Sequence, residues 1–138
     1  MTMHLSYLLT PFLTWLVAGG AKFAFNSFRS GKLAFSLIGY GGFPSNHSAI
    51  VSSMAALVAF KEGIDSPAFG VALTLAFIVL LDASSLRRQV GRHAAAINQL
   101  ARDDVPMLRE RMGHAPVEIL AGCVLGVGVA WGAWQSLG

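Results

Sequence analysis

The chain has 138 residues, of which 54% are hydrophobic and only 12% are charged, and its mean hydropathy is +0.59. Soluble domains usually carry about twice that charged fraction, so the composition excludes an ordinary soluble enzyme. The net charge of +3 is small and comes from residues clustered between apolar segments, which argues against a nucleic-acid partner. The single cysteine, Cys123, excludes a disulfide framework and a cysteine-based metal site.

Four long segments contain no charged residue: Leu5–Ala21, Ser48–Phe60, Ser66–Leu81 and Ile119–Gly138. A transmembrane helix needs about 20 mostly apolar residues, and about 17 at the short end. We therefore predict an all-α fold: a small integral membrane helical bundle of about four transmembrane helices, with short re-entrant or interfacial pieces. It forms one domain over residues 1–138. The first segment lacks the basic start and the cleavage pattern of a signal peptide, so we expect it to be retained.

The first helix is expected from about His4 to Phe28, with Pro11 as a source of a kink. Residues 30–43 form a link. Its short apolar stretch, Leu33–Ile38, cannot span a bilayer and is expected to be re-entrant or half-buried. The second helix is expected over about Ser48–Phe60.

The third helix begins with Ser66 as its cap and Pro67 as its first residue, and it reaches at least Leu81. It either ends there or continues to about Ala101, because the later part of this stretch has high helix propensity. The last helix is expected over about Pro116–Trp134.

The basic residues fall in the links after the first and third helices. With four spans, both links lie on one face of the membrane, and the excess of Lys and Arg would make that face cytoplasmic. Both ends of the chain would then face outward. If these arginines bind a substrate, their position reflects chemistry as well as topology. We expect a multi-pass protein of a bacterial inner membrane.

The stretch Gly41–Ala49 reads Gly-Gly-Phe-Pro-Ser-Asn-His-Ser-Ala. Its two glycines and its proline make a turn directly before a helix. Ser45, Asn46 and His47 therefore lie at a helix N-terminus, where free backbone N–H groups favour an anion. The alternative is that Ser45 or Asn46 only caps the helix and His47 is a polar residue at the membrane surface.

A second histidine, His114, stands just before the helix that Pro116 begins, and Glu118 follows four residues after it. A carboxylate at this spacing can accept a ring N–H and leave the other ring nitrogen free to attack. His47, on the same membrane face, could protonate a leaving oxygen. The nearby Lys and Arg residues would offset the charge of a phosphoryl group. Together these residues indicate cleavage of a phosphate ester through a phosphohistidine.

These motifs resemble the divergent, short branch of the type 2 phosphatidic acid phosphatase family, which is related to the vanadium-dependent haloperoxidases. The family's first motif is Lys, six residues, then Arg-Pro. Lys22 and Arg29 have that spacing, with Ser30 in place of the proline. Pro44–His47 stands where the family has Pro-Ser-Gly-His, with asparagine in place of the glycine.

The family's third motif is Ser-Arg, five residues, His, three residues, Asp. His114 and Glu118 have the His-to-acid spacing, with glutamate in place of aspartate. Leu108 occupies the position of the motif arginine, so another arginine has to serve. The candidates are Arg87, Arg88, Arg109 and Arg111.

The resemblance implies His114 as the nucleophile, Glu118 as the residue that orients it, and His47 as the acid for the leaving group. The phosphate-binding residues that it implies are Lys22, Arg29, Ser45, Asn46 and one or more of Arg87, Arg88, Arg109 and Arg111, with Asp82 and Asn98 in support. It also implies catalysis without a metal or other cofactor. The implied substrate is a lipid phosphate or diphosphate, such as polyprenyl pyrophosphate or phosphatidic acid.

Two questions stay open at this stage. Asn46 and the displaced motif arginine leave room for a second hypothesis, a non-catalytic protein that binds or transports a lipid phosphate. Gly122, Gly126 and Gly128 have small-x-x-x-small spacing, or nearly so, which predicts either close packing of helices within the chain or a homodimer.

Overall fold

The computed structural model describes residues 5–31, 33, 42–100 and 106–137. These residues form five α-helices: α1 (Leu5–Ser30), α2 (Asn46–Glu62), α3 (Pro67–Ser84), α4 (Leu86–Leu100) and α5 (Pro116–Leu137). No strand occurs among them, and the predicted all-α membrane fold is confirmed. The predicted re-entrant stretch lies outside the described residues, apart from Leu33.

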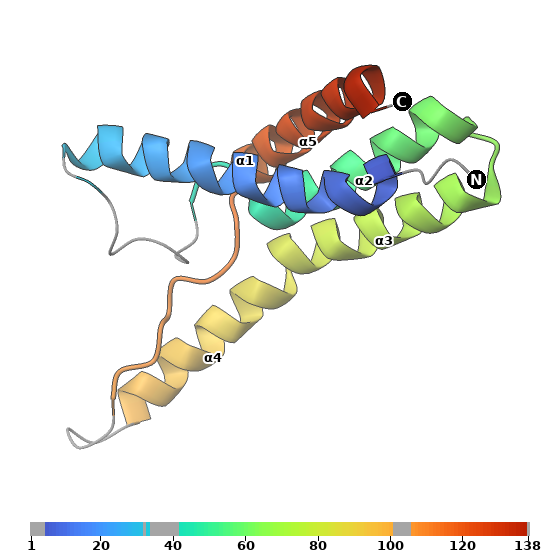
Figure 1. The fold of residues 1–138 in the computed structure, drawn as a ribbon. Coiled ribbons are helices and arrows are strands. Elements are labelled where there is room, and N and C mark those ends of the chain that lie inside the picture. Colours follow the sequence, from blue (N-terminus) through green and yellow to red (C-terminus); the bar gives the residue numbers. More distant parts are fainter. Residues whose placement is uncertain (1–4, 32, 34–41, 101–105, 138) are drawn as a thin grey trace.

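Three segments are long and apolar enough to cross a membrane: α1, α5 and the stretch Pro67–Leu100 that contains α3. The remaining helix of the bundle, α2, has 17 residues and packs against all three of them. In Figure 1, α2 and α5 run opposite to α1 and α3. Both labelled chain ends lie at one end of the bundle, and the starts of α2 and α5 lie toward the other.

The starts of α2 and α3 follow from their caps. The Ser45 hydroxyl accepts the Ser48 N–H at the start of α2, and the Ser66 hydroxyl accepts the Phe69 N–H at the start of α3. Pro67 is the first residue of α3, as predicted. Gly63 ends α2 with a φ of 84°, a positive value that glycine adopts readily.

Small side chains form the interior of the bundle. The buried residues of α1 recur every four positions, at Ser6, Thr10, Thr14 and Ala18, and therefore share one face. Large apolar side chains point outward instead; Phe12, for example, is 62% exposed. This arrangement suits a lipid bilayer, in which helices associate through close contacts between small residues.

The closest contact in the bundle joins α2 to α5. A Cβ atom on Gly122 would overlap the carbonyl oxygen of Ser45, and one on Gly126 would overlap that of Ala49. The predicted small-residue spacing therefore serves packing within the chain, so these two glycines are not available as a dimer face. A Cβ on Gly128 would have no atom within 4 Å.

The third predicted helix does not continue as one piece to residue 101. The hydroxyls of Ser84 and Ser85 both donate to the carbonyl of Leu81, at 3.0 Å and 2.7 Å. Serine hydroxyls that bond back in this way compete with the helical pattern and bend helices. A new helix, α4, starts at Leu86 and leaves the bundle at an angle (Figure 1).

Candidate active site

His114 is held at the junction of α3 and α5. Its backbone N–H donates to the carbonyl of Ala83 at 3.1 Å, and its side chain is only 6% exposed. The preceding Gly113 has a φ of 93°, and a Cβ there would press against Arg88. Only glycine fits this turn without strain, so Gly113 allows the chain to bring His114 back to the bundle.

Glu118 orients the His114 ring. Its Oε2 atom lies 3.0 Å from Nδ1 of His114 and also accepts the backbone N–H of Ala115 at 2.9 Å. The second bond is the glutamate half of a capping box, because Glu118 is the third residue of α5. An ionised carboxylate only accepts hydrogen bonds, so Nδ1 carries the proton and Nε2 keeps its lone pair.

The start of α2 is attached to the start of α5. The backbone N–H of Ser45 donates to the carbonyl of Glu118 at 3.0 Å. Ser45 is fully buried, and its hydroxyl accepts the Ser48 hydroxyl at 2.8 Å. The main role of the Ser45 side chain here is therefore to fix the first turn of α2, and with it His47, beside Glu118.

Arg87, near the start of α4, contacts His47. Its Nη2 atom lies 3.0 Å from Nε2 of His47. Arginine can only donate, so Nε2 of His47 accepts this hydrogen bond and the proton of the neutral ring lies on Nδ1. Of the four arginines that could replace the motif arginine, the structure brings Arg87 to the histidines.

The surroundings of His47, which lies outside the three spanning segments, disfavour the protonated form of its ring. Partial burial lowers the pKa of His47. The positive charge of Arg87 lowers it further, as do the His114 ring when it is protonated and the ammonium of Lys22, while Asp82 acts in the opposite direction. These residues come from four different segments, so the site is assembled by tertiary packing.

We predict that His47 titrates below the usual histidine pKa of about 6.5 in the free protein. The Arg87→Gln change removes one of the positive charges that disfavour the imidazolium, so it should raise this pKa. The titration of the ring signals by NMR measures both values. Arg92→Gln, on the exposed side of α4, is the matched control and should leave the pKa unchanged. A His47 pKa at or above the usual value would contradict the prediction.

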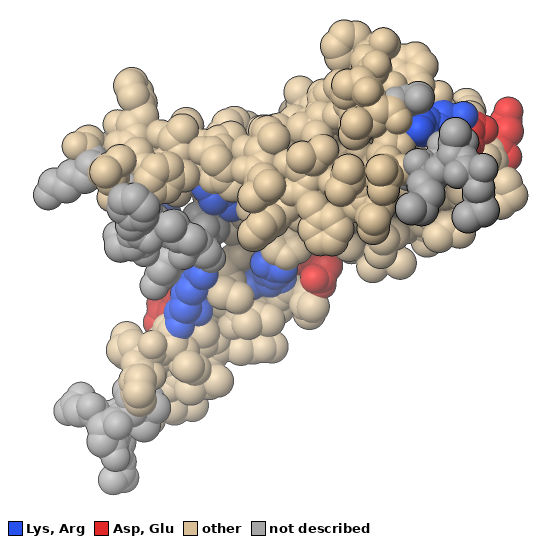
Figure 2. Space-filling model, in the orientation of Figure 1, with Lys and Arg blue, Asp and Glu red and all other residues tan. Residues whose placement is uncertain are grey.

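Three further polar residues lie around the histidines. Lys22 is half-buried on α1, and its ammonium is close enough to Glu118 and His47 to interact with both. The Oδ1 atom of Asn46 is buried and has no hydrogen-bond donor among the described residues. Figure 2 shows Lys and Arg side chains gathered where α4 leaves the bundle, with an acidic side chain beside them. The geometry therefore offers a positively charged site with one unused acceptor.

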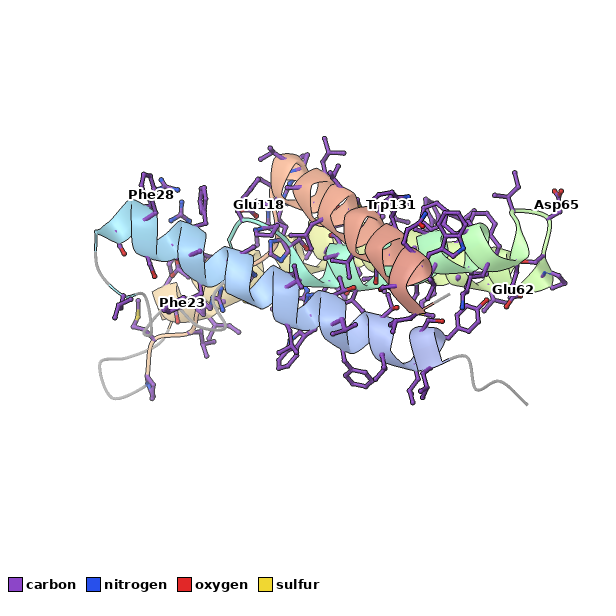
Figure 3. All side chains as sticks on the ribbon, turned by 45° about the horizontal axis from the view of Figure 1, so that its top comes forward. Phe23, Phe28, Glu62, Asp65, Glu118 and Trp131 are labelled. Carbon is purple, nitrogen blue, oxygen red and sulfur yellow. The ribbon has the colours of Figure 1, made fainter. Side chains whose placement is uncertain are left out.

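Three of the predicted phosphate ligands are not brought to the histidines. Arg29 is exposed in the last turn of α1, and its neighbour Phe28 lies far from Glu118 in Figure 3. Arg109 and Arg111 are exposed on the segment after α4, where Nε of Arg109 donates to the carbonyl of Arg111 at 3.2 Å. Among the described residues, no hydrogen bond or ion pair joins Arg29 or Arg111 to either histidine.

Arg88 and Asn98 support the site from outside. The Arg88 backbone and Cγ pack against Gly113, directly before His114. Asn98 pairs with the backbone of Leu108, donating to its carbonyl and accepting its N–H, both at 2.8 Å. Asn98 therefore holds the segment that returns from α4 to His114.

The sequence did not predict two contacts that position the segment between α4 and His114. A Cβ on Gly91 would overlap the carbonyl oxygen of Glu110, so the glycine allows the returning segment to lie directly on α4. The other is the hydrogen bond from His114 to Ala83. Gly91 and Gly113 in the sequence could have indicated these close approaches of the backbone. The role of a backbone carbonyl such as that of Ala83 cannot be read from a sequence, because every residue has one.

No group of three or more His, Cys, Asp or Glu side chains that could hold a metal ion occurs in the described part of the chain. The chemical groups that the structure does bring together are a buried, oriented imidazole, a second imidazole, an arginine and a lysine. This set suits the binding and transfer of a phosphoryl group.

Comparison with known proteins agrees with the motifs. The model of the Divergent PAP2 family matches residues 3–129. The chain is also 36% identical to the uncharacterized membrane protein YuiD of Bacillus subtilis (strain 168), in a match that covers 71% of this chain and 74% of the relative. No solved structure matches the chain. Because the family match runs from α1 into α5 and includes both histidines, the chain belongs to the Divergent PAP2 family.

Proposed function

We propose that this protein is a multi-pass membrane phosphatase that hydrolyses a lipid phosphate or diphosphate through a phosphohistidine on His114. The observation that carries the proposal is the orientation of His114. Glu118 binds its Nδ1 side, so its Nε2 lone pair is the nucleophile. His47 and Arg87, which contact each other, and Lys22 add the acid and the positive charges that phosphoryl transfer requires.

In the first step, Nε2 of His114 attacks phosphorus and the bond from phosphorus to the lipid oxygen breaks. The bonding electrons leave with that oxygen, which takes a proton from His47. In the second step, a water molecule attacks the phosphorus of the phosphohistidine and gives its proton to His47. The bond between phosphorus and Nε2 of His114 breaks, and its electron pair returns to that nitrogen. Inorganic phosphate leaves, and both histidines return to their first states. Lys22 and Arg87 stabilise the negative charge in both steps.

Substrate binding would change the state of His47. The Arg87 guanidinium donates to His47 in the free protein, and a phosphate oxygen is a stronger acceptor for it. Transfer of Arg87 to the phosphate frees Nε2 of His47, and the nearby negative charge favours protonation of the ring. The site therefore gains its proton donor when the phosphate is bound. The unused Oδ1 atom of Asn46 could accept the hydrogen of a protonated phosphate oxygen.

The direct test is phosphate release by the detergent-solubilised protein with EDTA present. The substrates are phosphatidic acid, phosphatidylglycerophosphate and undecaprenyl pyrophosphate. We expect turnover of at least one of them, and a phosphorylated peptide containing His114 after rapid denaturation in alkali, where phosphohistidine survives. Tight binding of all three without turnover would replace the proposal with a lipid-phosphate binding or transport function. Turnover without any label on His114 would overturn the phosphohistidine.

The role of His47 makes a separate prediction. His47→Gln should reduce kcat about 10²- to 10⁴-fold for a lipid phosphate, whose alkoxide leaving group needs a proton. The loss should be much smaller for p-nitrophenyl phosphate, because nitrophenolate leaves without protonation. Equal losses on both substrates would mean that His47 binds phosphate rather than donating a proton. The measurement is kcat of the unmutated protein and of His47→Gln with each of the two substrates.

A further inference from the structure

An apolar groove of about 650 Å³ lies between α1, α5 and the turn before α2. Ala21 and Phe25 line it from α1, Phe43 and Pro44 from the turn, and residues including Leu120 and Ala121 from α5. All of its lining residues are apolar, and its volume falls within the range of small-molecule sites. The groove is therefore large enough for a ligand, and its described lining residues offer no polar side chain to hold one.

The elements that line the groove also carry residues of the candidate active site. Three of its lining residues directly precede site residues in the chain: Ala21 precedes Lys22, Pro44 precedes Ser45, and Val117 precedes Glu118. A molecule in the groove would therefore touch the elements that carry the phosphate ligands. The groove and the site are therefore built on the same three parts of the fold.

The groove is open toward the outer surface of α5. Val117, Leu120 and Val124 line it and are 61%, 64% and 66% exposed. The rings of Phe25 and Phe43, whose centroids are 5.1 Å apart, close one wall. Along α5 the same face continues to Gly128 and Gly132, where a Cβ would meet no atom within 4 Å. A long chain could therefore lie along α5 and extend past the groove.

We propose that this groove holds one hydrocarbon chain of the lipid whose phosphate is bound by Lys22 and Arg87. This inference rests on the proposed function and narrows its substrate class: a lipid phosphate with a long chain, taken up sideways from the bilayer. The apolar lining contributes van der Waals contacts with the chain, and the cationic site fixes the other end of the molecule. Water-soluble phosphate esters lack the first of these contributions.

Photolabelling tests the groove without depending on turnover. A phosphatidic acid with a diazirine in mid-chain is added to the His114→Gln protein, in which the substrate is not consumed. We expect labels on the α1 and α5 peptides that contain Phe25 and Leu120, reduced about tenfold by excess phosphatidic acid and unaffected by diacylglycerol. Labelling that phosphatidic acid and diacylglycerol reduce equally would overturn the proposal. So would labelling that lies on a second copy of the protein.

Filling the groove provides the matched comparison. Ala121→Trp places an indole in the groove, whereas Val71→Trp places the same indole on the outer surface of α3, where Val71 is 72% exposed. Ala121→Trp should reduce labelling about tenfold and lower kcat/KM for a long-chain lipid phosphate by a similar factor. It should leave kcat/KM for a short-chain, water-soluble analogue unchanged, and Val71→Trp should change neither.

The two proposals fail in different ways. If the unmutated protein turns over no substrate but the groove is labelled and Ala121→Trp prevents labelling, the phosphatase assignment fails. The assignment of the groove as a site for a hydrocarbon chain then stands. If turnover occurs and Ala121→Trp affects long- and short-chain substrates alike, the groove does not bind the chain, and the phosphatase assignment stands.

Discussion

Replacement of His114 by glutamine is expected to lower kcat about 10³-fold or more, because the amide cannot form the covalent intermediate. The backbone hydrogen bond from residue 114 to Ala83 and the turn at Gly113 do not depend on the imidazole. The protein should therefore stay folded, with a thermal unfolding midpoint near that of the unmutated protein. Phosphate release and thermal unfolding in detergent measure the two effects. Activity within about tenfold of the unmutated value would exclude His114 as the nucleophile.

Glu118→Gln should also lower kcat, by about 10²- to 10⁴-fold, because the uncharged amide stabilises the required His114 tautomer less well. Glu110→Gln is the control. Glu110 lies outside the site, and its Oε1 atom accepts from Asn98 at 2.9 Å, which a glutamine oxygen can still do. Removal of that charge should leave kcat unchanged. An equal loss for both variants would show that net charge, rather than orientation of His114, is responsible.

Gly126→Leu is expected to have the largest effect on stability. A side chain there would overlap the carbonyl oxygen of Ala49, which is backbone within α2 and cannot turn aside. Overpacking of a close contact usually costs about 1–3 kcal/mol, and we expect the upper end of this range. The separation of α2 from α5 would also move His47 away from His114, so activity should fall even in the molecules that remain folded.

Gly128→Leu provides the matched control, because it adds the same side chain to the same helix where a Cβ meets no atom within 4 Å. It should change the midpoint of thermal unfolding little, whereas Gly126→Leu should lower it by several degrees or more. The hydrophobicity of the helix rises equally in both. A similar midpoint for both variants would show that the α2–α5 contact does not contribute to stability as described.

The sequence was sufficient for most of the fold. Segments without charge predicted the helices of the bundle, and Ser66 with Pro67 placed the start of α3 correctly. The end of α3 could not be predicted, since helix propensity continues across Ser84 and Ser85. The break at these two residues depends on hydroxyl groups that bond back to Leu81, and serines in a helix do so only in some contexts.

The site was predictable where its contacts are local. His114 and Glu118 are four residues apart at a helix start, so their pairing depends on backbone geometry that the sequence indicates. His47 and Arg87 are 40 residues apart, and the sequence offered four arginines for one role. Tertiary packing decides among them, because the Arg87 side chain at the start of α4 contacts His47 at the start of α2, while Arg109 and Arg111 lie on the exposed returning segment.

The contact between α2 and α5 also bears on how the protein is made. Among the described helices, α5 is translated last, so α1 to α3 can enter the membrane before Gly122 and Gly126 are available. Until then, the face of α2 that carries Ser45 and Ala49 has no matching helix, and His114 has no carboxylate to orient it. A chain stalled during insertion would therefore be inert, and the chemistry would begin only when the last helix has docked.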